Sequence, residues 1–427
     1  MRHVTTTVAI GMVAALALTA CGRAGDDGGT VSAGTSTTID DEPATGQITV
    51  WAMGEEAGYL PDFLAAFTEE NPDAEVSVTS IPWSDVATKV QTAVAGGSVP
   101  DVVMIGTSMM PLFISTGGLA AVPDGLVDAD GFVQGAADST IADGVTYGVP
   151  WYVETRVLYY RTDLAEAAGV TAPTTWDELT DFATALQRGG ADYGIQLPVG
   201  DAEDSTQVVM PFYVQAGGQV LNDEGTAYTL EDDAMVQALE YYASFFQDGL
   251  ASSAGYGDTQ ASAFVDGSAP AFFSGPWVVN QLAELTSTDW VQDNVGTVVV
   301  PAGTDGNASY IGGASFGVFA DAQNPEGGWK LIRWLTESET EQQWYGVASE
   351  LPALQAAWDG TALTSSDRVA VFSDQLQDVW APPTVPSWDE LSGVIESEAE
   401  KVAAGTETAQ DAATAIQAQA DTLGLGW

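Results

Sequence analysis

Residues 47–80, QITVWAMGEEAGYLPDFLAAFTEENPDAEVSVTS, carry the pattern that decides the fold. Residues 48–51 form a short apolar run with β-branched side chains, which predicts a strand. The stretch 59–70 has apolar residues at helical spacing, and 74–80 alternates like a second strand. A strand, a helix and a second strand in this order predict a parallel pair of strands joined by a crossover helix.

The same order of elements continues downstream. Residues 83–95 predict a helix, 100–104 a third strand and 111–117 a short helix. This βαβαβα order predicts a mostly parallel sheet covered by helices, and ligands of such sheets bind beyond the carboxyl ends of the strands. Residues 53–56 and 107–110 follow the first and third strands, so we expect them at the mouth of a ligand site.

The second half of the chain adds further strands and helices. Residues 144–160 form two extended runs rich in aromatic side chains, and 312–319 looks like a strand that returns to the first half. The segment 382–388 is rich in proline and predicts a loop before a final pair of helices. A chain of this length is expected to form two lobes and not one core.

The N-terminus has the features of a secretion signal. An apolar run over residues 8–18 is too short for a comfortable membrane span. It ends in LTAC at 18–21, which resembles a bacterial lipobox, although an ordinary signal with an incidental cysteine is the alternative. We predict a signal peptide over 1–20, a lipid anchor on Cys21, and a flexible tether over 21–45, which is rich in Gly, Ser, Thr and Asp.

The composition excludes several classes of function. With 60 acidic and 10 basic residues, the formal net charge is −50, which disfavours nucleic acid, anionic lipid and acidic substrates as partners. The only histidine, His3, lies in the predicted signal, and Cys21 is the only cysteine. Catalytic Ser-His-Asp or Cys-His systems and zinc sites built on His or Cys are therefore excluded from the mature chain. Hydrolysis of glycosides by paired carboxylates is the catalytic alternative that remains.

Several later segments, taken in order with residues 47–80, resemble the family 1 extracellular solute-binding proteins, which include maltose-binding protein. These segments are GVTYGVPWYVETRVLYYRTDL (144–164), TWDEL (175–179), GPW (275–277), GGASFGVF (312–319) and LPALQ (351–355). The resemblance covers nearly the whole mature chain. It implies an α/β fold of the type II periplasmic-binding-protein kind, in which two lobes joined by crossing strands close over a sugar.

The resemblance also implies boundaries and partners. The N-lobe is expected to comprise residues 46–152 and 309–357, and the C-lobe residues 153–308 and 358–427. The ligand is expected to be a short oligosaccharide that is delivered, chemically unaltered, to the permease subunits of an ABC importer. We expect a monomer, held on the extracytoplasmic face of the membrane by its lipid, with no enzymatic activity, cofactor or metal.

Sugar sites combine aromatic platforms for C–H faces with carboxylates and amides for hydroxyl groups. Trp151, Tyr152, Glu154 and Arg156 cluster where the family places its inter-lobe crossing, with Glu154 as a hydroxyl acceptor and Arg156 as its charge partner. The remaining ligand-binding candidates match family positions or segments that can line the cleft: Glu55, Ser108, Asp204, Gln207, Trp277, Trp380 and Trp388. Relatives often carry a charged residue near Ser108, so a preference for maltose does not transfer to this chain.

Two other readings remain open at this point. A polyamine or another cationic solute would also suit aromatic rings and carboxylates, because cations favour the faces of aromatic rings. A secreted glycoside hydrolase would use two of the many carboxylates. Thermal-shift screening with oligosaccharides and polyamines separates the first reading from sugar binding, and release of reducing sugar tests the second.

Overall fold

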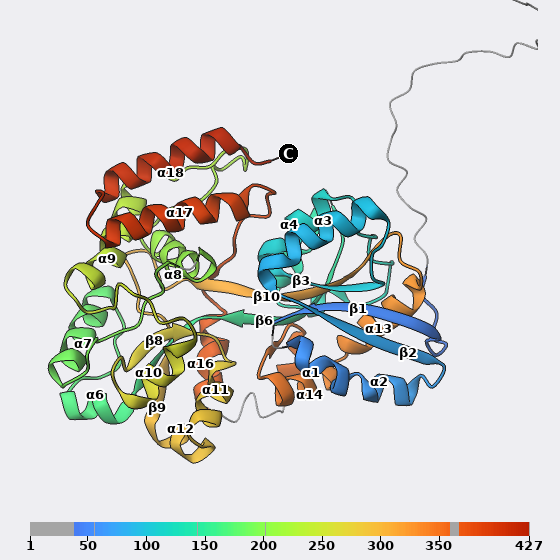
Figure 1. Cartoon of the computed structure of the whole chain (residues 1–427), viewed down its shortest axis with the longest axis horizontal. Coiled ribbons are helices and arrows are strands. Elements are labelled where there is room, and N and C mark those ends of the chain that lie inside the picture. Colours follow the sequence, from blue (N-terminus) through green and yellow to red (C-terminus); the bar gives the residue numbers. More distant parts are fainter. Residues whose placement is uncertain (1–37, 55, 143, 201, 359–366, 427) are drawn as a thin grey trace, which may run out of the picture. The chain divides into compact units, whose positions relative to one another are not determined.

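The computed structural model describes residues 38–54, 56–142, 144–200, 202–358 and 367–426. The predicted signal peptide and Cys21 lie outside the described residues. Two main β-sheets organise the described part (Figure 1). The larger sheet contains β1 (Gly46–Met53), β2 (Ala74–Ile81), β3 (Val102–Gly106), β6 (Val149–Thr155), β10 (Ser309–Val318), β11 (Leu351–Pro352) and β12 (Val379–Trp380). The smaller sheet contains β7 (Val157–Arg161), β8 (Ala271–Ser274) and β9 (Val295–Val298), and a separate hairpin pairs β4 (Ile141–Ala142) with β5 (Val145–Thr146).

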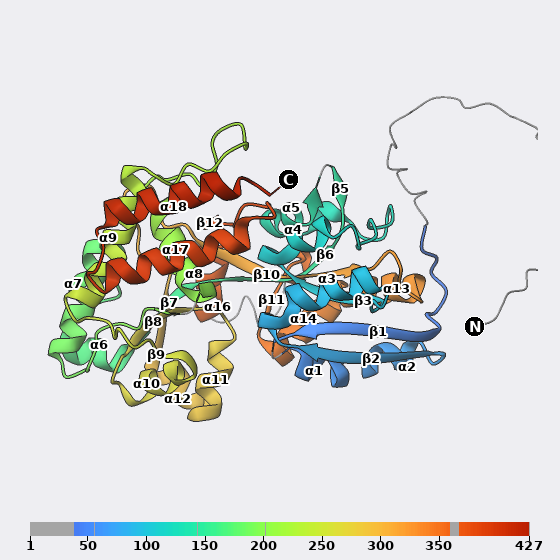
Figure 2. The same cartoon turned by 45° about the horizontal axis from the view of Figure 1, so that its top comes forward.

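The helices fall into two groups, one around each main sheet. The first group comprises α1 (Glu56–Phe63), α2 (Ala65–Glu70), α3 (Val86–Gly96), α4 (Met110–Ser115), α5 (Gln134–Ser139), α13 (Pro325–Leu335) and α14 (Ser338–Ala348). The second comprises α6 (Thr162–Ala168), α7 (Trp176–Arg188), α8 (Ala202–Gln215), α9 (Asp233–Gln247), α10 (Gln260–Asp266), α11 (Val278–Leu285), α12 (Thr288–Asn294), α16 (Asp367–Gln375), α17 (Trp388–Ala403) and α18 (Ala409–Leu423). In Figures 1 and 2, α3 and α4 cover one face of the larger sheet, and α1 and α2 cover the other.

The larger sheet confirms the predicted parallel core. Strand β1 pairs in parallel with β2 and β3, so that Val50 lies beside both Val78 and Val102. All of β3 is buried, as expected for a central strand covered on both faces. Strand β10 then runs antiparallel to β3 and β6, which extends the sheet with segments from the second half of the chain.

Two crossing strands connect the halves, which confirms the predicted two-lobe α/β fold. Strand β6 continues through Arg156 into β7, which belongs to the smaller sheet. Strand β10 pairs with β12 at its start and with β6 and β3 further along. Figure 1 shows β6 and β10 running between the two groups of helices. The expected lobe boundary between residues 152 and 153 falls inside β6, a single continuous strand.

Strand β10 contains an irregularity beside the crossing. Its register against β6 shifts between Ala314 and Ser315. The neighbouring Gly313 has a φ of +127°, and a Cβ atom there would lie 2.2 Å from the carbonyl oxygen of Tyr152. Because only glycine accepts both the positive φ and this close backbone approach, the bulge requires Gly313.

Apolar side chains form two clusters. One covers the larger sheet and extends to β7, α11 and α12, and the other lies among α7, α8, α9, α17 and α18. Helices α17 and α18, the predicted final pair, pack on each other and on α9. In the part of the chain that the structure describes, no helix combines the length and the apolar character needed to cross a bilayer.

Residues 38–45 correct the predicted tether. Lys330 on α13 forms an ion pair with Asp40 at 2.6 Å, and Arg333 forms one with Asp41 at 3.2 Å. The side chain of Ala44 is buried, and its backbone N–H donates to the Oδ1 atom of Asn71 at 2.6 Å. These contacts attach residues 40–44 to the first lobe, so a flexible tether that reaches residue 45 does not describe this chain.

Candidate functional site

Three neighbouring cavities lie at the crossing of the two halves. The central chamber, of about 550 Å³, is walled by the ends of β1 and β3, by β6, and by Trp277 from the second half. The side chamber, of about 620 Å³, is walled mainly by α10, α11 and β8. The end chamber, of about 240 Å³, lies beside β12 and the start of α17.

These chambers are parts of one cleft, because they share walls. The central and side chambers have three lining residues in common: Arg156, Trp277 and Gln281. The central and end chambers also share three: Ser108, Met109 and Tyr310. Gln207 lines both the side and the end chamber. A ligand in the central chamber therefore has two directions in which it can extend.

The carboxyl ends of β1 and β3 form one wall of the central chamber, at the predicted ligand mouth. Gly54 and Glu56 follow β1, and residues 107–109 follow β3 as a single 3₁₀ turn. The indole of Trp83 lies against this backbone, because a Cβ atom at Gly106 would come within 3.0 Å of its ring. Glycine at the strand end thus leaves room for the indole of Trp83 in the chamber wall.

Strand β6 supplies a phenol to the same wall. Tyr152 is nearly buried, and its hydroxyl donates to the Oε1 atom of Glu56 at 2.6 Å. Burial raises the pKa of the Tyr152 phenol well above its usual value, and the charges of Glu56, Glu350 and Glu154 raise it further. The phenol therefore stays protonated at neutral pH and holds the carboxylate of Glu56 in place.

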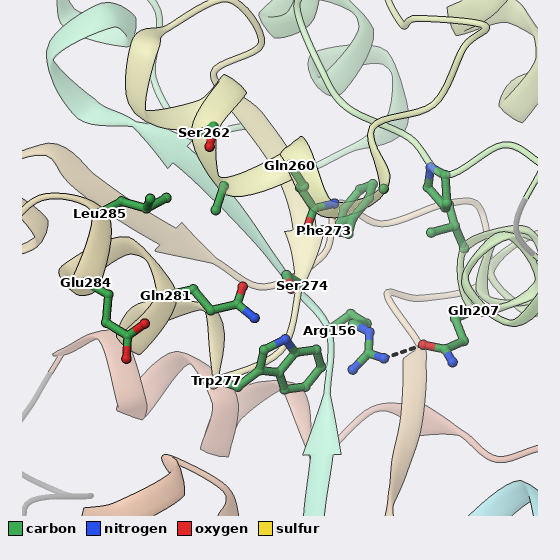
Figure 3. Close-up of a pocket in the computed structure, with 14 residues that line it drawn as sticks. Arg156, Gln207, Gln260, Ser262, Phe273, Ser274, Trp277, Gln281, Glu284 and Leu285 are labelled. Carbon is green, nitrogen blue, oxygen red and sulfur yellow. Dashed lines mark hydrogen bonds between the residues drawn. The ribbon is translucent and has the colours of Figure 1, made fainter. Parts of the chain in front are cut away.

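Arg156 occupies the junction of the chambers. Its Nη1 atom lies 3.2 Å from the Oε1 atom of Glu154, and its Nη2 atom donates to the amide oxygen of Gln207 (Figure 3). Its guanidinium carbon lies 4.6 Å from the ring centroid of Trp277 and 5.7 Å from that of Tyr310. Arg156 therefore combines an ion pair, a hydrogen bond and two cation–π contacts.

Trp277 owes its position to the turn before α11. The turn follows β8, and the hydroxyl of Tyr159 donates to the carbonyl of Gly275 at 2.9 Å. A Cβ atom at Gly275 would lie 1.7 Å from the indole ring, so the ring can fold back over the turn only because residue 275 is glycine. In Figure 3 the indole lies beside Arg156, on the wall that the central and side chambers share.

Aromatic rings also line the end chamber. The centroids of Trp380 and Trp388 are 5.7 Å apart, and those of Tyr310 and Trp380 are 6.3 Å apart. Trp388 is 4% exposed, so little of its side chain is available to the chamber. The three rings form a continuous apolar wall from the central chamber to the start of α17.

The side chamber is mostly polar. Gln260 and Ser262 project from α10, and Gln281 and Glu284 from α11, around the ring of Phe273 (Figure 3). Sequence reasoning missed these residues, since amides on short helices carry no motif. It also did not name five residues of the central chamber: Glu56, Tyr59, Trp83, Tyr310 and Glu350. Of these, only Glu56 lies in a segment expected at the ligand mouth, 53–56.

Most of the predicted ligand-binding residues lie on the cleft walls: Ser108, Tyr152, Glu154, Arg156, Gln207, Trp277, Trp380 and Trp388. Two cannot be placed. Glu55 lies outside the described residues. The backbone of Asp204 belongs to α8, but its side chain is outside the described part.

The structure corrects the prediction for Trp151. Its side chain is fully buried, and its ring packs against Phe316 and Trp344 at centroid distances of 4.5 and 4.6 Å. The reason is the alternation of a strand, in which successive side chains point to opposite faces. Because Tyr152 and Glu154 face the cleft, Trp151 faces the core.

The chemistry of the cleft is that of non-covalent recognition. The central chamber presents the carboxylates of Glu56, Glu154 and Glu350 and one guanidinium, that of Arg156. Such a wall disfavours anionic ligands. Within the described residues, no three Asp, Glu, His or Cys side chains gather in a way that could hold a metal ion.

Comparison with known proteins agrees with this geometry. Residues 53–342 match the family model described as bacterial extracellular solute-binding protein. The galactooligosaccharide-binding protein of Bacillus subtilis is 24% identical, over 84% of this chain and 85% of that protein. The diacetylchitobiose binding protein DasA of Streptomyces coelicolor is also 24% identical, over 88% of this chain and 87% of its own length.

A solved structure extends the likeness to three dimensions. The sugar-binding protein MalE from Xanthomonas citri superimposes with a TM-score of 0.79 at 28% identity, and the likeness covers 88% of this chain and 97% of that one. This likeness and the family match confirm the predicted fold and the predicted resemblance. The family match spans well over half of the residues of this chain. The chain therefore belongs to the bacterial extracellular solute-binding proteins, a family of binding proteins and not of enzymes.

Proposed function

We propose that this protein captures a short oligosaccharide in the three-chamber cleft and delivers it to an ABC importer from a lipid anchor at Cys21. The observation that carries the proposal is the run of aromatic rings along all three chambers, with carboxylates and amides between them. Rings suit the C–H faces of sugars, and the polar groups suit their hydroxyl edges. The binding step involves no covalent chemistry.

The size of the cleft favours an oligosaccharide over a single sugar. Each of the two larger chambers falls in the range of about 300–1,000 Å³ that is typical of small-molecule sites. They meet at Trp277, so one ligand can contact that ring from either chamber. The relatives named for galactooligosaccharide and diacetylchitobiose support the same class of ligand.

A cationic solute is a second candidate, favoured by the carboxylates of the central chamber. Glu56, Glu154 and Glu350 outnumber Arg156 there, and Tyr59 and Trp83 add aromatic faces that attract cations. A polyamine would use these groups without needing the side chamber. Binding assays with spermidine beside the sugars therefore separate the two candidates.

Isothermal titration of the protein, produced without its first 37 residues, tests the proposal. The panel is maltose, maltotetraose, lactose, diacetylchitobiose and spermidine. We expect at least one sugar to bind and spermidine not to bind. Trp277→Ala should weaken sugar binding by about tenfold, the equivalent of about 1.4 kcal/mol. Trp290→Ala, which removes an indole outside the three chambers, is the control and should bind normally. Binding of spermidine alone would replace the sugar proposal by the cationic one.

The anchor requires a separate experiment in cells. Full-length protein with Cys21→Ser should leave the membrane fraction, while its affinity for the same sugar stays unchanged. A variant that still sediments with membranes after a high-salt wash would contradict lipidation at Cys21. Delivery is tested by uptake of the bound sugar, which should require both this protein and the permease subunits.

A further inference from the structure

Arg156 contacts residues from four separate segments of the chain. Glu154 is on β6, Gln207 on α8, Trp277 at the start of α11 and Tyr310 on β10. The backbone of Arg156 is also held, since its carbonyl oxygen accepts a hydrogen bond from the Ser309 hydroxyl at 2.8 Å. The side chain of Arg156 is only 12% exposed. The guanidinium is therefore enclosed by protein groups at the point where the chain crosses between the lobes.

The four partners together line every chamber of the cleft. Trp277 lines both the central and the side chamber, Tyr310 both the central and the end chamber, and Gln207 both the side and the end chamber. Glu154 lines the central chamber. We propose that Arg156 is a positioning residue, which sets the relative orientation of these walls and acts on ligand affinity through Trp277 and Gln207. This inference rests on the proposed sugar-binding function.

Lysine cannot replace arginine in this role. A guanidinium is flat, so it can lie against two rings while its edge bonds to a carboxylate and an amide. An ammonium keeps the charge but lacks the planar edge and the stacking face. Arg156→Lys should therefore preserve attraction to Glu154 and release Trp277 and Gln207.

The chain offers a matched control in Arg161, five residues further along. Its guanidinium carbon lies 4.8 Å from the ring centroid of Trp290, and its Nη2 atom forms an ion pair with Asp163 at 2.7 Å. Neither Arg161 nor Trp290 lines the three chambers. Arg161→Lys repeats the same chemical change in a similar environment away from the ligand.

The test compares affinities by titration with whichever of maltose, maltotetraose, lactose and diacetylchitobiose binds the unaltered protein most tightly. Arg156→Lys should weaken binding by about tenfold, and Arg161→Lys by less than about twofold. The decisive variant is the double substitution with Trp277→Ala. If Arg156 acts through the ring, the double variant should bind at most about threefold more weakly than Trp277→Ala alone.

Each outcome is decisive. A double variant whose loss equals the product of the single losses would mean that Arg156 acts independently of Trp277, and would overturn the positioning role. The positioning role would also be overturned if Arg156→Lys bound the sugar as tightly as the unaltered protein. The same holds if Arg161→Lys lost as much affinity for the sugar as Arg156→Lys. An unaltered protein that binds none of the four sugars would instead refute the proposed function, and this inference with it.

Discussion

Two arginines that stand five residues apart in sequence, Arg156 and Arg161, each lie beside a tryptophan but are held differently. Arg161 donates to backbone carbonyls of Phe264 and Val265 at 3.2 and 2.7 Å, in addition to its ion pair and its contact with Trp290. The Arg156 guanidinium bonds to the side chains of Glu154 and Gln207 and lies against the rings of Trp277 and Tyr310. Backbone partners join β7 to α10 as part of the fold. The named partners of Arg156 are side chains that line the cleft, which makes the Arg156 pair suited to a ligand site.

The largest expected effect comes from the turn that places Trp277. Gly275→Ala should weaken sugar binding by at least about tenfold, as much as Trp277→Ala, because the added Cβ would occupy space 1.7 Å from the indole ring and displace it from Arg156. Titration calorimetry on the folded variant measures this loss. Gly96→Ala is the control, since a Cβ there meets no atom within 4 Å. Normal binding by Gly275→Ala would mean that the ring position does not matter.

The acidic partners of the two arginines provide a second comparison. Glu154→Gln should weaken sugar binding by about tenfold, since it replaces a charged hydroxyl acceptor by a neutral one and removes the carboxylate 3.2 Å from a mostly buried guanidinium. Asp163→Asn should leave affinity unchanged, because Asp163 lines none of the three chambers. If Glu154→Gln and Asp163→Asn lost the same affinity for sugar, the two arginine pairs would not differ in their role in binding. Both variants are measured against the same sugar.

The smallest effect concerns stability and pH on the Arg161 side. The hydrogen bond from Arg161 lowers the pKa of the Asp163 carboxyl below its usual value. A lowered folded-state pKa stabilises the protein above the unfolded pKa of about 4, and this stabilisation is lost as the pH falls through the folded value. Asp163→Asn should therefore cost less than about 1 kcal/mol at pH 7, since the carboxylate is 43% exposed. Denaturant unfolding should show the difference shrinking at pH 3 and below, and a constant difference would contradict this account.

Much of the fold can be predicted from residue patterns in the sequence, whereas the residues of the cleft can be predicted only in part. The alternation in 74–80 and the apolar run around 102–104 predict strands because burial demands those patterns. The predicted helix over 59–70 is divided into α1 and α2, with Pro61 inside α1, where it cannot donate a backbone hydrogen bond.

The site is harder because it joins distant segments. Alternation in β6 separates Trp151 from Tyr152 but does not say which face is the core. Glu350 and Gln281 reach the central chamber through tertiary packing that leaves no local signal. Trp277 could be found because a glycine and a proline precede it in a segment that matches the family.

The bulge of β10 places backbone where a ligand in the central chamber can contact it. Gly313 lines the central chamber, while its strand is hydrogen-bonded to β3, β6 and β12. A ligand in contact with Gly313 therefore contacts the backbone of β10 directly, because glycine has no side chain. Both halves of the molecule share this strand. Amide hydrogen exchange along β10 should slow when the chamber fills, so the backbone amides of this strand report whether a ligand is bound.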